Sequence, residues 1–353
     1  MSNLLKLLGF LTIINVFGFD NSSVINRFKN WIDEHQIQTD NNHYLAHLFE
    51  NWLDNDKFIE QTNSMNLTYT LGHNAYSGMN SEEFAEFMGL KDNQYLLDQN
   101  NVFLRGNMFT TEQDEILNSN TLPSSIDWRM KNAVTPIKSQ GSCGSCWSFS
   151  TTGALEGAYA IKYGNLLSFS EQQLVDCDNG LTKDHGCNGG LMDSAFQWIS
   201  QNGGLCTEQN YPYVSGKTQK AGTCQTNCIS VSGSKILKYT DVSANSDNAM
   251  MTALTQQPVS VAIEADQKSF QMYKSGVFQD SNCGTNLDHG VLLVGYGSTN
   301  GQDYYILKNS WDISWGMQGY MNLGRGNDPN TGKPFNNGAG QCGVLGMASY
   351  PTI

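Results

Sequence analysis

Residues 140–150 read Gln140-Gly141-Ser142-Cys143-Gly144-Ser145-Cys146-Trp147-Ser148-Phe149-Ser150, with two cysteines three positions apart among small residues. Cys146 begins a predicted helix that carries an apolar stripe as far as Ile161 and ends near Gly164. Unpaired N–H groups and the positive dipole end at a helix start favour a thiolate over a thiol. A catalytic thiolate also needs a base and a partner that orients the base, and both must come from elsewhere in the chain.

The pair Cys143 and Cys146 has three interpretations. A thioredoxin-like redox pair requires a preceding strand in a short parallel α/β unit, whereas loop-like sequence precedes this pair. A zinc site requires a second pair of ligands, which Cys224 and Cys228 would supply, but disulfide pairing explains those two residues equally well. The third interpretation is a structural half-cystine beside a reactive thiol. The motif by itself does not choose among them.

His289 favours the third interpretation. It stands directly before a buried-looking strand, and only His185 and His289 of the six histidines follow Leu122. An imidazole can take the proton of Cys146 and leave a thiolate–imidazolium pair. Asn309, after another strand, would accept a hydrogen bond from the imidazole, and Trp311 would shield that bond from water. Alone, each of these residues is better explained as structural, Asn309 as a turn residue.

The composition indicates a two-domain chain, or one domain with a large appendage, that does not bind nucleic acid. The chain has 353 residues and a formal net charge of −13. Of the 33 acidic residues 16 precede Leu122, against only 6 of the 20 basic ones, so the N-terminal third is strongly acidic. Nine cysteines are an odd number, which in a secreted protein predicts one thiol and four disulfides.

The N-terminus predicts entry into the secretory pathway. Residues 1–18 carry Lys6 and then a short apolar run, the layout of a signal peptide; an N-terminal membrane anchor is the alternative. Secretion would make Asn21 and Asn66 possible glycosylation sites. Residues 20–120 are predicted to be mostly helical, with a capping box at Asn80–Glu83. The polar residues 99–120 are typical of an exposed, cleavable linker.

From Leu122 onward the pattern changes twice. Helices are predicted at 146–164, 170–175 and 192–199, and after about Ser232 strands are predicted at 259–263, 291–294 and 304–307. Helices followed by strands indicate an α+β fold with two lobes and a cleft between them.

Together these residues resemble the papain-like cysteine peptidases, and the cathepsin L-like branch most closely. The similarity runs from Leu122 to Ile353 and rests on motifs in the right order: Leu122-Pro123-x-x-Ile126-Asp127-Trp128, Cys143-Gly144-Ser145-Cys146-Trp147, Gly186-Cys187-Asn188-Gly189-Gly190-Leu191-Met192-Asp193, Tyr211-Pro212-Tyr213, Gln257-Pro258-Val259-Ser260-Val261, Gly295-Tyr296-Gly297, Lys308-Asn309-Ser310-Trp311 and Ser349-Tyr350-Pro351. The resemblance implies a papain-like two-lobed fold, with a helical lobe at about 122–232, a β-barrel-like lobe at about 233–338 and a C-terminal tail at 339–353.

The N-terminal third resembles the inhibitory propeptide of the same family, which the resemblance places at residues 19–121 as a helical prodomain. Trp52, Asn55, Ile59 and Asn63 follow its helical motif, but Tyr44 and Leu48 replace the expected Glu and Arg. The second motif is Gly72-x-Asn74-x-Tyr76-x-Gly78, with Tyr for Phe and Gly for Asp. These departures question the usual salt bridges of the prosegment and leave the catalytic groups untouched.

The resemblance assigns a role to each candidate site residue. Cys146 would be the nucleophile, His289 the acid and base, and Asn309 the orienting partner, while Gln140 and the Cys146 N–H would bind the oxyanion. Apolar or small residues would form the pocket for the side chain two before the cleaved bond, with Met347 shortening it. The predicted substrate-binding residues are Gly189, Gly190, Leu191, Met192, Ala262, Leu287, Asp288, Gly290, Trp311, Trp315 and Met347. No metal or cofactor is implied.

The resemblance also implies the disulfides. The pairs would be Cys143–Cys187, Cys177–Cys224, Cys206–Cys228 and Cys283–Cys342, with an exchange of Cys224 and Cys228 left open. Asp312 stands where the family usually has Gly; if that Gly takes a positive φ, aspartate would tolerate the conformation poorly but better than most residues. Residues 327–340 form a longer loop than close relatives have, and the sequence gives it no function.

The resulting hypothesis is a monomeric endopeptidase made as a zymogen. Its partners would be protein and peptide substrates and its own propeptide, which would be released at acidic pH by cleavage near Leu122. It would prefer an apolar residue two before the scissile bond and reject Arg there. Its location would be a lysosome-like vacuole or outside the cell. The alternative is a non-catalytic relative that acts as a binding or inhibitory module.

Overall fold

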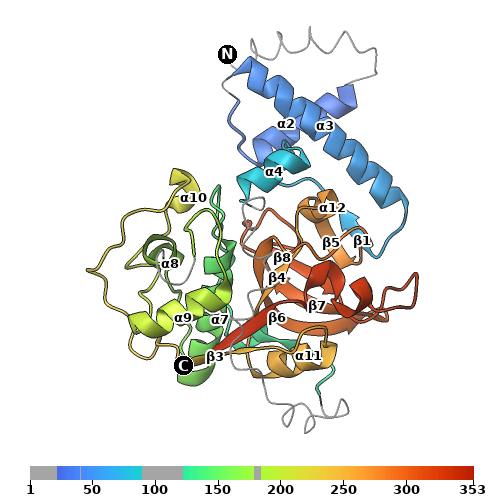
Figure 1. The fold of residues 1–353 in the computed structure, drawn as a ribbon. Coiled ribbons are helices and arrows are strands. Elements are labelled where there is room, and N and C mark those ends of the chain that lie inside the picture. The colour runs from blue at the N-terminus through green and yellow to red at the C-terminus, as the bar shows by residue number, and fades with distance from the viewer. Residues whose placement is uncertain (1–21, 40, 90–121, 179–183) are drawn as a thin grey trace.

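A computed structural model describes residues 22–39, 41–89, 122–178 and 184–353 (Figure 1). The predicted signal peptide, Asn21 and the predicted linker 99–120 lie outside the described residues. Three parts are visible: N-terminal helices, a lobe built mostly from helices, and a lobe built mostly from strands (Figure 1).

The N-terminal helices form a small unit with its own core. Helices α2 (Ser22–Glu34) and α3 (Asn42–Ser64) bury one cluster between them, made of Ile25, Phe28, Trp31, Leu45, Leu48 and Trp52. Helix α4 (Ser81–Phe87) begins with the predicted capping box, in which Asn80 and Glu83 bond each other's backbone N–H. The helical prediction for this part missed strand β1 (Tyr69–Leu71). This strand forms because it pairs with strand β5 (Tyr273–Phe278) of the lobe built mostly from strands.

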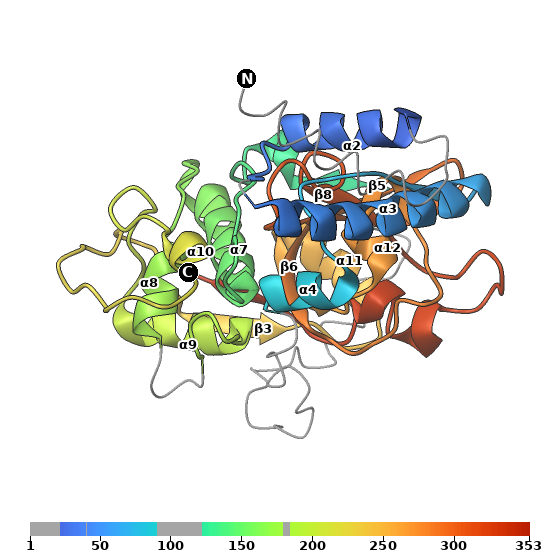
Figure 2. The ribbon, with the colours of Figure 1, turned by 90° about the horizontal axis from the view of Figure 1, so that it is seen from above.

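The helical lobe is organised around helix α7 (Cys146–Tyr163). It starts at Cys146 as predicted and ends at Gly164, whose φ of 70° no β-branched residue would adopt readily. Most of α7 is buried, because it lies between the other helices of its lobe and the sheet (Figure 2). Those helices are α8 (Glu171–Cys177), α9 (Met192–Asn202) and the short α10 (Ser215–Thr218).

The sheet runs in the order β1-β5-β8-β7-β6-β4-β9-β3, with β2 also paired to β6. Among the described strands, β5 and β8 pair in parallel and the other pairs are antiparallel. The strands from β2 to β9 are Ile126–Asp127, Lys238–Asp241, Val259–Ile263, Tyr273–Phe278, His289–Thr299, Gln302–Lys308, Tyr320–Gly324 and Ala348–Thr352. All three predicted strands are confirmed, as β4, β6 and β7.

Helices interrupt the part of the chain for which the sequence suggested strands. They are α11 (Asp247–Gln256) and α12 (Lys268–Gln271), and Ser246 caps α11 through the Ala249 N–H. Three 3₁₀ turns complete the described elements: η3 (Trp128–Lys131), η4 (Phe335–Gly338) and η5 (Gln341–Gly343). None of the described helices has the length and apolar character that crossing a membrane requires.

The two lobes meet where α7 lies along β6. Ser150 donates from its hydroxyl to the Val291 carbonyl (2.6 Å), and Ser260 of β4 donates to the Ser150 carbonyl (2.9 Å). A Cβ on Gly153 would lie 2.8 Å from the end of the Leu292 side chain, so the absence of a side chain there leaves room for Leu292 against the helix. Small and hydroxyl-bearing residues on one face of α7 therefore set its distance from the sheet.

Four disulfides brace the loops, and their pairs are Cys143–Cys187, Cys177–Cys224, Cys206–Cys228 and Cys283–Cys342. The loop 327–340 is tied to the last of them, because the Asn336 side chain donates to the carbonyls of Cys283, Gly284 and Gly340. Asp312 has a positive φ, at 67°.

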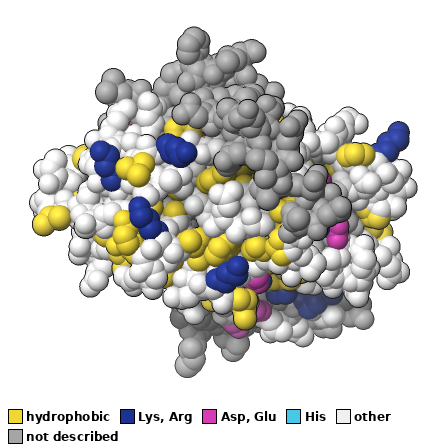
Figure 3. Space-filling model, turned by 90° about the horizontal axis from the view of Figure 1, so that it is seen from below, with side chains coloured by type: hydrophobic (Ala, Val, Ile, Leu, Met, Phe, Trp, Pro, Cys, Tyr) yellow, Lys and Arg dark blue, Asp and Glu magenta, His cyan; other side chains and the backbone are white. Residues whose placement is uncertain are grey.

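The charge of the surface is uneven. Seen from below, away from the N-terminal helices, the described surface shows Lys and Arg among scattered hydrophobic side chains and few acidic groups (Figure 3). Of the net charge of −13, most comes from the N-terminal third of the sequence.

Asn63 joins the end of α3 to β1, which gives a first prediction. Its amide donates to the Leu71 carbonyl (3.0 Å) and accepts from the Leu71 N–H (2.9 Å). Replacing Asn63 with Ala leaves both backbone groups without these partners and should destabilise the N-terminal unit by about 1–3 kcal/mol. Thermal unfolding of the full chain would measure the loss. The neighbouring Ser64→Ala change removes only an exposed bond to Gln61 and should cost under ~0.5 kcal/mol; equal losses would contradict this assignment.

Candidate active site

Cys146 occupies the start of α7 and is only 1% exposed. The N-cap Ser145 makes no side-chain hydrogen bond to the first turn, and that turn contains no acidic residue. The positive end of the helix is therefore not offset by groups of its own first turn. Cys146 is also the one cysteine outside the four disulfides, so its sulfur remains a thiol in a position that favours the thiolate.

His289 opens strand β6 and is fully buried. Its Nε2 lies 2.8 Å from Oδ1 of Asn309, and the Trp311 ring stacks on the imidazole with 4.6 Å between ring centroids. Since the asparagine oxygen can only accept, Nε2 carries a proton and Nδ1 is the basic nitrogen. Nδ1 is buried and makes no hydrogen bond to any described residue.

Packing brings the residues that follow the thiol and the imidazole into contact. Gly290 follows His289, and a Cβ on it would lie 3.3 Å from the backbone N and Cα of Trp147, which follows Cys146. The first turn of α7 thus touches the first residues of β6. A side chain at position 290 would force these backbone atoms to shift by a few tenths of an ångström.

Burial sets the charge of this imidazole. It lowers the pKa of His289 to about 4, and the hydrogen bond to Asn309 only partly opposes that shift. In the closed form described here, His289 is therefore neutral over most of the pH range and able to accept a proton.

Gln140 is fully buried and is held at three points. Its backbone N–H donates to the Ser310 carbonyl (2.8 Å), its carbonyl accepts from the Tyr213 hydroxyl (2.8 Å), and its Oε1 accepts from the Ser310 hydroxyl (2.7 Å). The side-chain NH₂ is the remaining polar group of Gln140. It donates to the carbonyls of Cys143 (3.1 Å) and Met88 (3.2 Å).

The hydrogen bond from Gln140 to Met88 shows that the N-terminal unit occupies the site. Met88 belongs to the N-terminal unit, and the next residue, Gly89, lies so close to Gly144 that a Cβ would be 2.4 Å from its Cα. Phe84 packs edge-on against Trp311 at 5.0 Å, and Tyr76 donates to the Trp311 carbonyl (2.9 Å). The N-terminal unit therefore covers Gln140 with the Met88 backbone and Trp311 with the side chains of Phe84 and Tyr76.

The predicted pocket residues largely come together. Leu191, Met192, Ala262, Leu287 and Met347 share one hydrophobic cluster. A Cβ on Gly290 would approach the Met192 sulfur at 3.1 Å, which places that residue against the same pocket. Gly189 has a φ of 101°, and a Cβ on Gly190 would lie 2.7 Å from the Trp147 ring.

Three other predicted residues lie apart from that cluster. Asp288 accepts from the Ala265 N–H (2.8 Å), and its burial, together with the charge of Asp266, raises its pKa well above the ordinary value. Trp311 covers His289, whereas Trp315 lies behind Trp311, stacked on Phe270. Both tryptophans are completely buried in this form.

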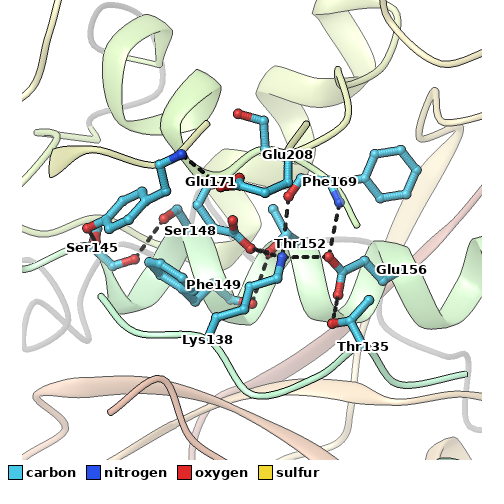
Figure 4. A network of polar contacts seen from close by, with 12 residues as sticks. Thr135, Lys138, Ser145, Ser148, Phe149, Thr152, Glu156, Phe169, Glu171 and Glu208 are labelled. Atoms are coloured by element: carbon cyan, nitrogen blue, oxygen red, sulfur yellow. Dashed lines mark hydrogen bonds and ion pairs between the residues drawn. The ribbon is translucent and has the colours of Figure 1, made fainter. Parts of the chain in front are cut away.

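A buried ionic network beneath the site was not predicted (Figure 4). Lys138 contacts Glu156 of α7 and Glu171 of α8, and these two anions are the main reason that its pKa is raised despite burial. Lys308, next to Asn309, donates to Thr135, which in turn donates to Glu156. Burial lowers the pKa of Lys308 to about 8. A glutamate within the apolar stripe of α7 was the available signal, because such a residue requires a buried partner.

Comparison with known proteins decides the family. The profile described as "Papain family cysteine protease" matches residues 122–352. The chain belongs to the papain family of cysteine proteases. The profile described as "Cathepsin propeptide inhibitor domain (I29)" matches residues 28–84, so this papain-family protease is made as a proform with its inhibitor domain in the same chain.

Individual relatives agree. Cysteine protease XCP2 of Arabidopsis thaliana is 43% identical over 335 residues, covering 94% of this chain and 87% of the relative. Germination-specific cysteine protease 1 of the same plant is 40% identical, with 92% and 83% covered.

Solved structures match the whole fold. A recombinant stem bromelain precursor has a TM-score of 0.79 and 35% identity, with 94% of this chain and 99% of that chain covered. The digestive procathepsin L2 proteinase of the Tenebrio molitor larval midgut has a TM-score of 0.80 and 35% identity, with 94% and 100% covered. The papain-like two-lobed fold with a helical prosegment is thereby confirmed.

The structure explains how this papain-family prosegment tolerates its unusual motifs. Leu48 stands where the family has Arg and Gly78 where it has Asp, and a Cβ on Gly78 would lie 2.6 Å from Leu48 and 2.9 Å from Trp31. An apolar contact thus replaces an ion pair. Nearby, His47 and Asn51 contact the Glu83 carboxylate, which gives α3 and α4 a different polar link.

The buried imidazole gives a second prediction. In the intact proform His289 should titrate with a pKa of about 4, below the ordinary 6.5. Replacing Asn309 with Ala should lower that pKa further, because the bond to Asn309 raises it. NMR titration of the imidazole, in proform carrying Cys146→Ala to prevent processing, would measure both values. A pKa of 6 or above in the intact proform would contradict the burial described here.

Proposed function

We propose that Cys146, His289, Asn309 and Gln140 carry the peptide-bond hydrolysis of this cysteine protease. The observation that carries the proposal is the meeting of the α7 start with the β6 start, which sets the remaining thiol beside a buried imidazole bonded to Asn309. A nucleophile, a base and a group that orients the base are the parts that covalent acyl transfer requires.

The steps follow from this arrangement. Nδ1 of His289 takes the thiol proton, and the thiolate attacks the scissile carbonyl carbon. The carbonyl oxygen becomes an oxyanion, which accepts from the Gln140 side-chain NH₂ and the Cys146 backbone N–H. As the C–N bond breaks, the imidazolium donates its proton to the leaving amine. His289 then deprotonates a water that attacks the thioester, and the carboxylic acid and the thiol are released.

The prosegment supports the assignment of Gln140. The Met88 carbonyl accepts from the Gln140 NH₂ in the proform, so a prosegment oxygen holds the donor that the substrate oxygen would use. A substrate therefore has to displace this segment. Inhibition within the chain follows from occupancy of the site rather than from distortion of it.

Acid is proposed to open the proform. The N-terminal third carries 16 of the 33 acidic residues, and acidification would neutralise many of these carboxylates and weaken the contacts that depend on their charge. Lowering the pH therefore favours opening. Once a thiolate has formed, its charge raises the imidazole pKa and holds the active ion pair together.

The pocket favours apolar side chains. The clustered residues Leu191, Met192, Ala262, Leu287 and Met347 offer no charge to an arginine placed two before the cleaved bond. Met347 is only half-buried and extends from the strand β9 side, which would shorten the pocket.

The remaining assignments concern processing and location. We assign residues 1–18 to a signal peptide, 19–121 to the propeptide and 122–353 to the peptidase, as the family profiles on either side of residue 122 support. Four disulfides support folding in the secretory pathway. The mature enzyme is proposed to act as a monomer in an acidic vacuole or lysosome or outside the cell, and Asn66, which is exposed, as a glycosylation site.

One experiment tests the nucleophile and the processing together. Wild-type proform held at acidic pH should convert to a form that begins near Leu122 and hydrolyses a Leu-containing peptide. Cys146→Ala should do neither and should not react with an epoxide inhibitor. The control is Ser142→Ala in the same loop. Ser142 contacts Gly216 through its backbone N–H, which the substitution keeps, so this variant should behave as wild type. Hydrolysis by Cys146→Ala at the wild-type rate would refute the assignment.

The pocket gives a separate prediction. In a peptide library, kcat/KM should be highest with Leu or Val two before the cleaved bond and lowest with Arg. Met347→Ala should improve Phe relative to Leu by about 10-fold, because a methylene in such a pocket is worth about 1–3 kcal/mol. A preference for Arg in the wild-type enzyme would overturn the pocket assignment.

A further inference from the structure

Tyr213 connects two parts of the loop that carries the site. Its hydroxyl lies 2.8 Å from the Gln140 carbonyl and 2.7 Å from the Ser145 hydroxyl. A carbonyl can only accept, so the phenol donates to Gln140 and receives the Ser145 proton. Gln140 and Ser145 flank the loop 141–144, and Ser145 directly precedes Cys146. One phenol thus ties the proposed oxyanion donor to the start of α7.

Tyr213 is itself fixed at its backbone and at its ring. Its backbone N–H donates to the Glu208 carboxylate (2.8 Å), and its ring packs edge-on against Phe149 of α7 at 4.9 Å. Glu208 adjoins the ionic network of Lys138 and Glu171 drawn in Figure 4. The phenol position is therefore set by protein contacts at both ends of the residue.

The same segment holds the loop at a second point. Gly141 has a φ of 56°, and a Cβ on it would lie 2.6 Å from the Gly216 carbonyl oxygen. That oxygen accepts from the Ser142 N–H (3.0 Å). The chain from Tyr213 to Gly216 therefore lies against the loop along its length, and the Tyr213 hydroxyl is its side-chain contact with Gln140.

We propose that Tyr213 is a positioning residue for hydrolysis, which acts through the Gln140 backbone to aim the side-chain NH₂ at the developing oxyanion. The inference rests on the role proposed above for Gln140. Ser310 fixes the Gln140 N–H and Oε1, and Tyr213 fixes the remaining backbone group, the carbonyl. Burial raises the pKa of the Tyr213 phenol above its ordinary value, so the phenol keeps the proton that it donates.

Tyr211 offers a matched control within the same Tyr-Pro-Tyr motif. Tyr211 is buried whereas Tyr213 is partly exposed, and the Tyr211 hydroxyl donates to Asp176 (2.8 Å) and accepts from the Gln225 N–H (3.1 Å). None of these groups belongs to the proposed site. Replacing either tyrosine with Phe removes one hydrogen-bonded hydroxyl, so a general loss of stability should affect both variants alike.

The experiment compares Tyr213→Phe and Tyr211→Phe in full-chain protein processed at acidic pH, with the active enzyme titrated through its thiol. Tyr213→Phe should lower kcat by about 5- to 50-fold with little change in KM, less than the 10²–10³ lost when an oxyanion donor is removed. It should also weaken inhibition by a Leu-containing peptide aldehyde, because the adduct of the aldehyde carries the oxygen that Gln140 binds. The rate of exchange with 2,2′-dipyridyl disulfide, which forms no oxyanion, should stay unchanged. Tyr211→Phe should keep wild-type values in all three measurements.

A second background separates this inference from the role of Gln140. In a Gln140→Ala enzyme, adding Tyr213→Phe should cause no further loss of kcat, because the group being aimed is absent. Equal losses in Tyr213→Phe and Tyr211→Phe, or a further full loss in the Gln140→Ala background, would overturn the positioning role. If Gln140→Ala alone kept wild-type kcat, the oxyanion role of Gln140 would fail first.

Discussion

The contact between the first turn of α7 and the first residues of β6 is the constraint on which the rest depends. Cys146 and His289 come from different lobes, so their distance is set by how closely a helix can approach a strand. Gly290, Gly153 and the Ser150 hydroxyl make that approach close. A side chain at position 290 would press on the backbone of Trp147, and one at position 153 would displace the end of the Leu292 side chain. Catalytic geometry is thus decided at positions that take no part in the chemistry.

The same closeness fixes the electrostatics of the site. The imidazole is buried between Trp311 and the helix start, which lowers the pKa of His289 and keeps it a base. Beneath it, two cations, Lys138 and Lys308, face Glu156 and Glu171, so the interior carries charge with little net field. The site therefore receives its main electrostatic bias from the uncapped start of α7, which favours negative charge on the Cys146 sulfur.

The fold and the main candidate catalytic residues could be predicted from the sequence, because both rest on local patterns and motifs. The α7 start, strands β4, β6 and β7, and the Asn80 capping box follow from periodicity and capping chemistry within a few residues. Strand β1 did not, since it exists by pairing with β5 about two hundred residues away. For the same reason the sequence did not indicate that Tyr213 and Ser310 hold Gln140. Their partners are backbone groups of Gln140, and a backbone carbonyl leaves no trace in sequence.

The prosegment shows that a missing motif can be replaced as a unit. If only the Arg at position 48 were lost, an Asp at position 78 would remain without an opposite charge. If only the Asp were lost, the Arg would remain without one, and a charge without its partner is destabilising in a protein interior. Here both are absent, and Leu48 fills the space over Gly78 beside Trp31. Any Cβ at position 78 would now collide with that packing. The fold of the prosegment therefore no longer depends on the ionisation of that pair. Its response to pH must come from other acidic residues of the N-terminal third, while burial in the closed form lowers the pKa of His289 and keeps the imidazole neutral.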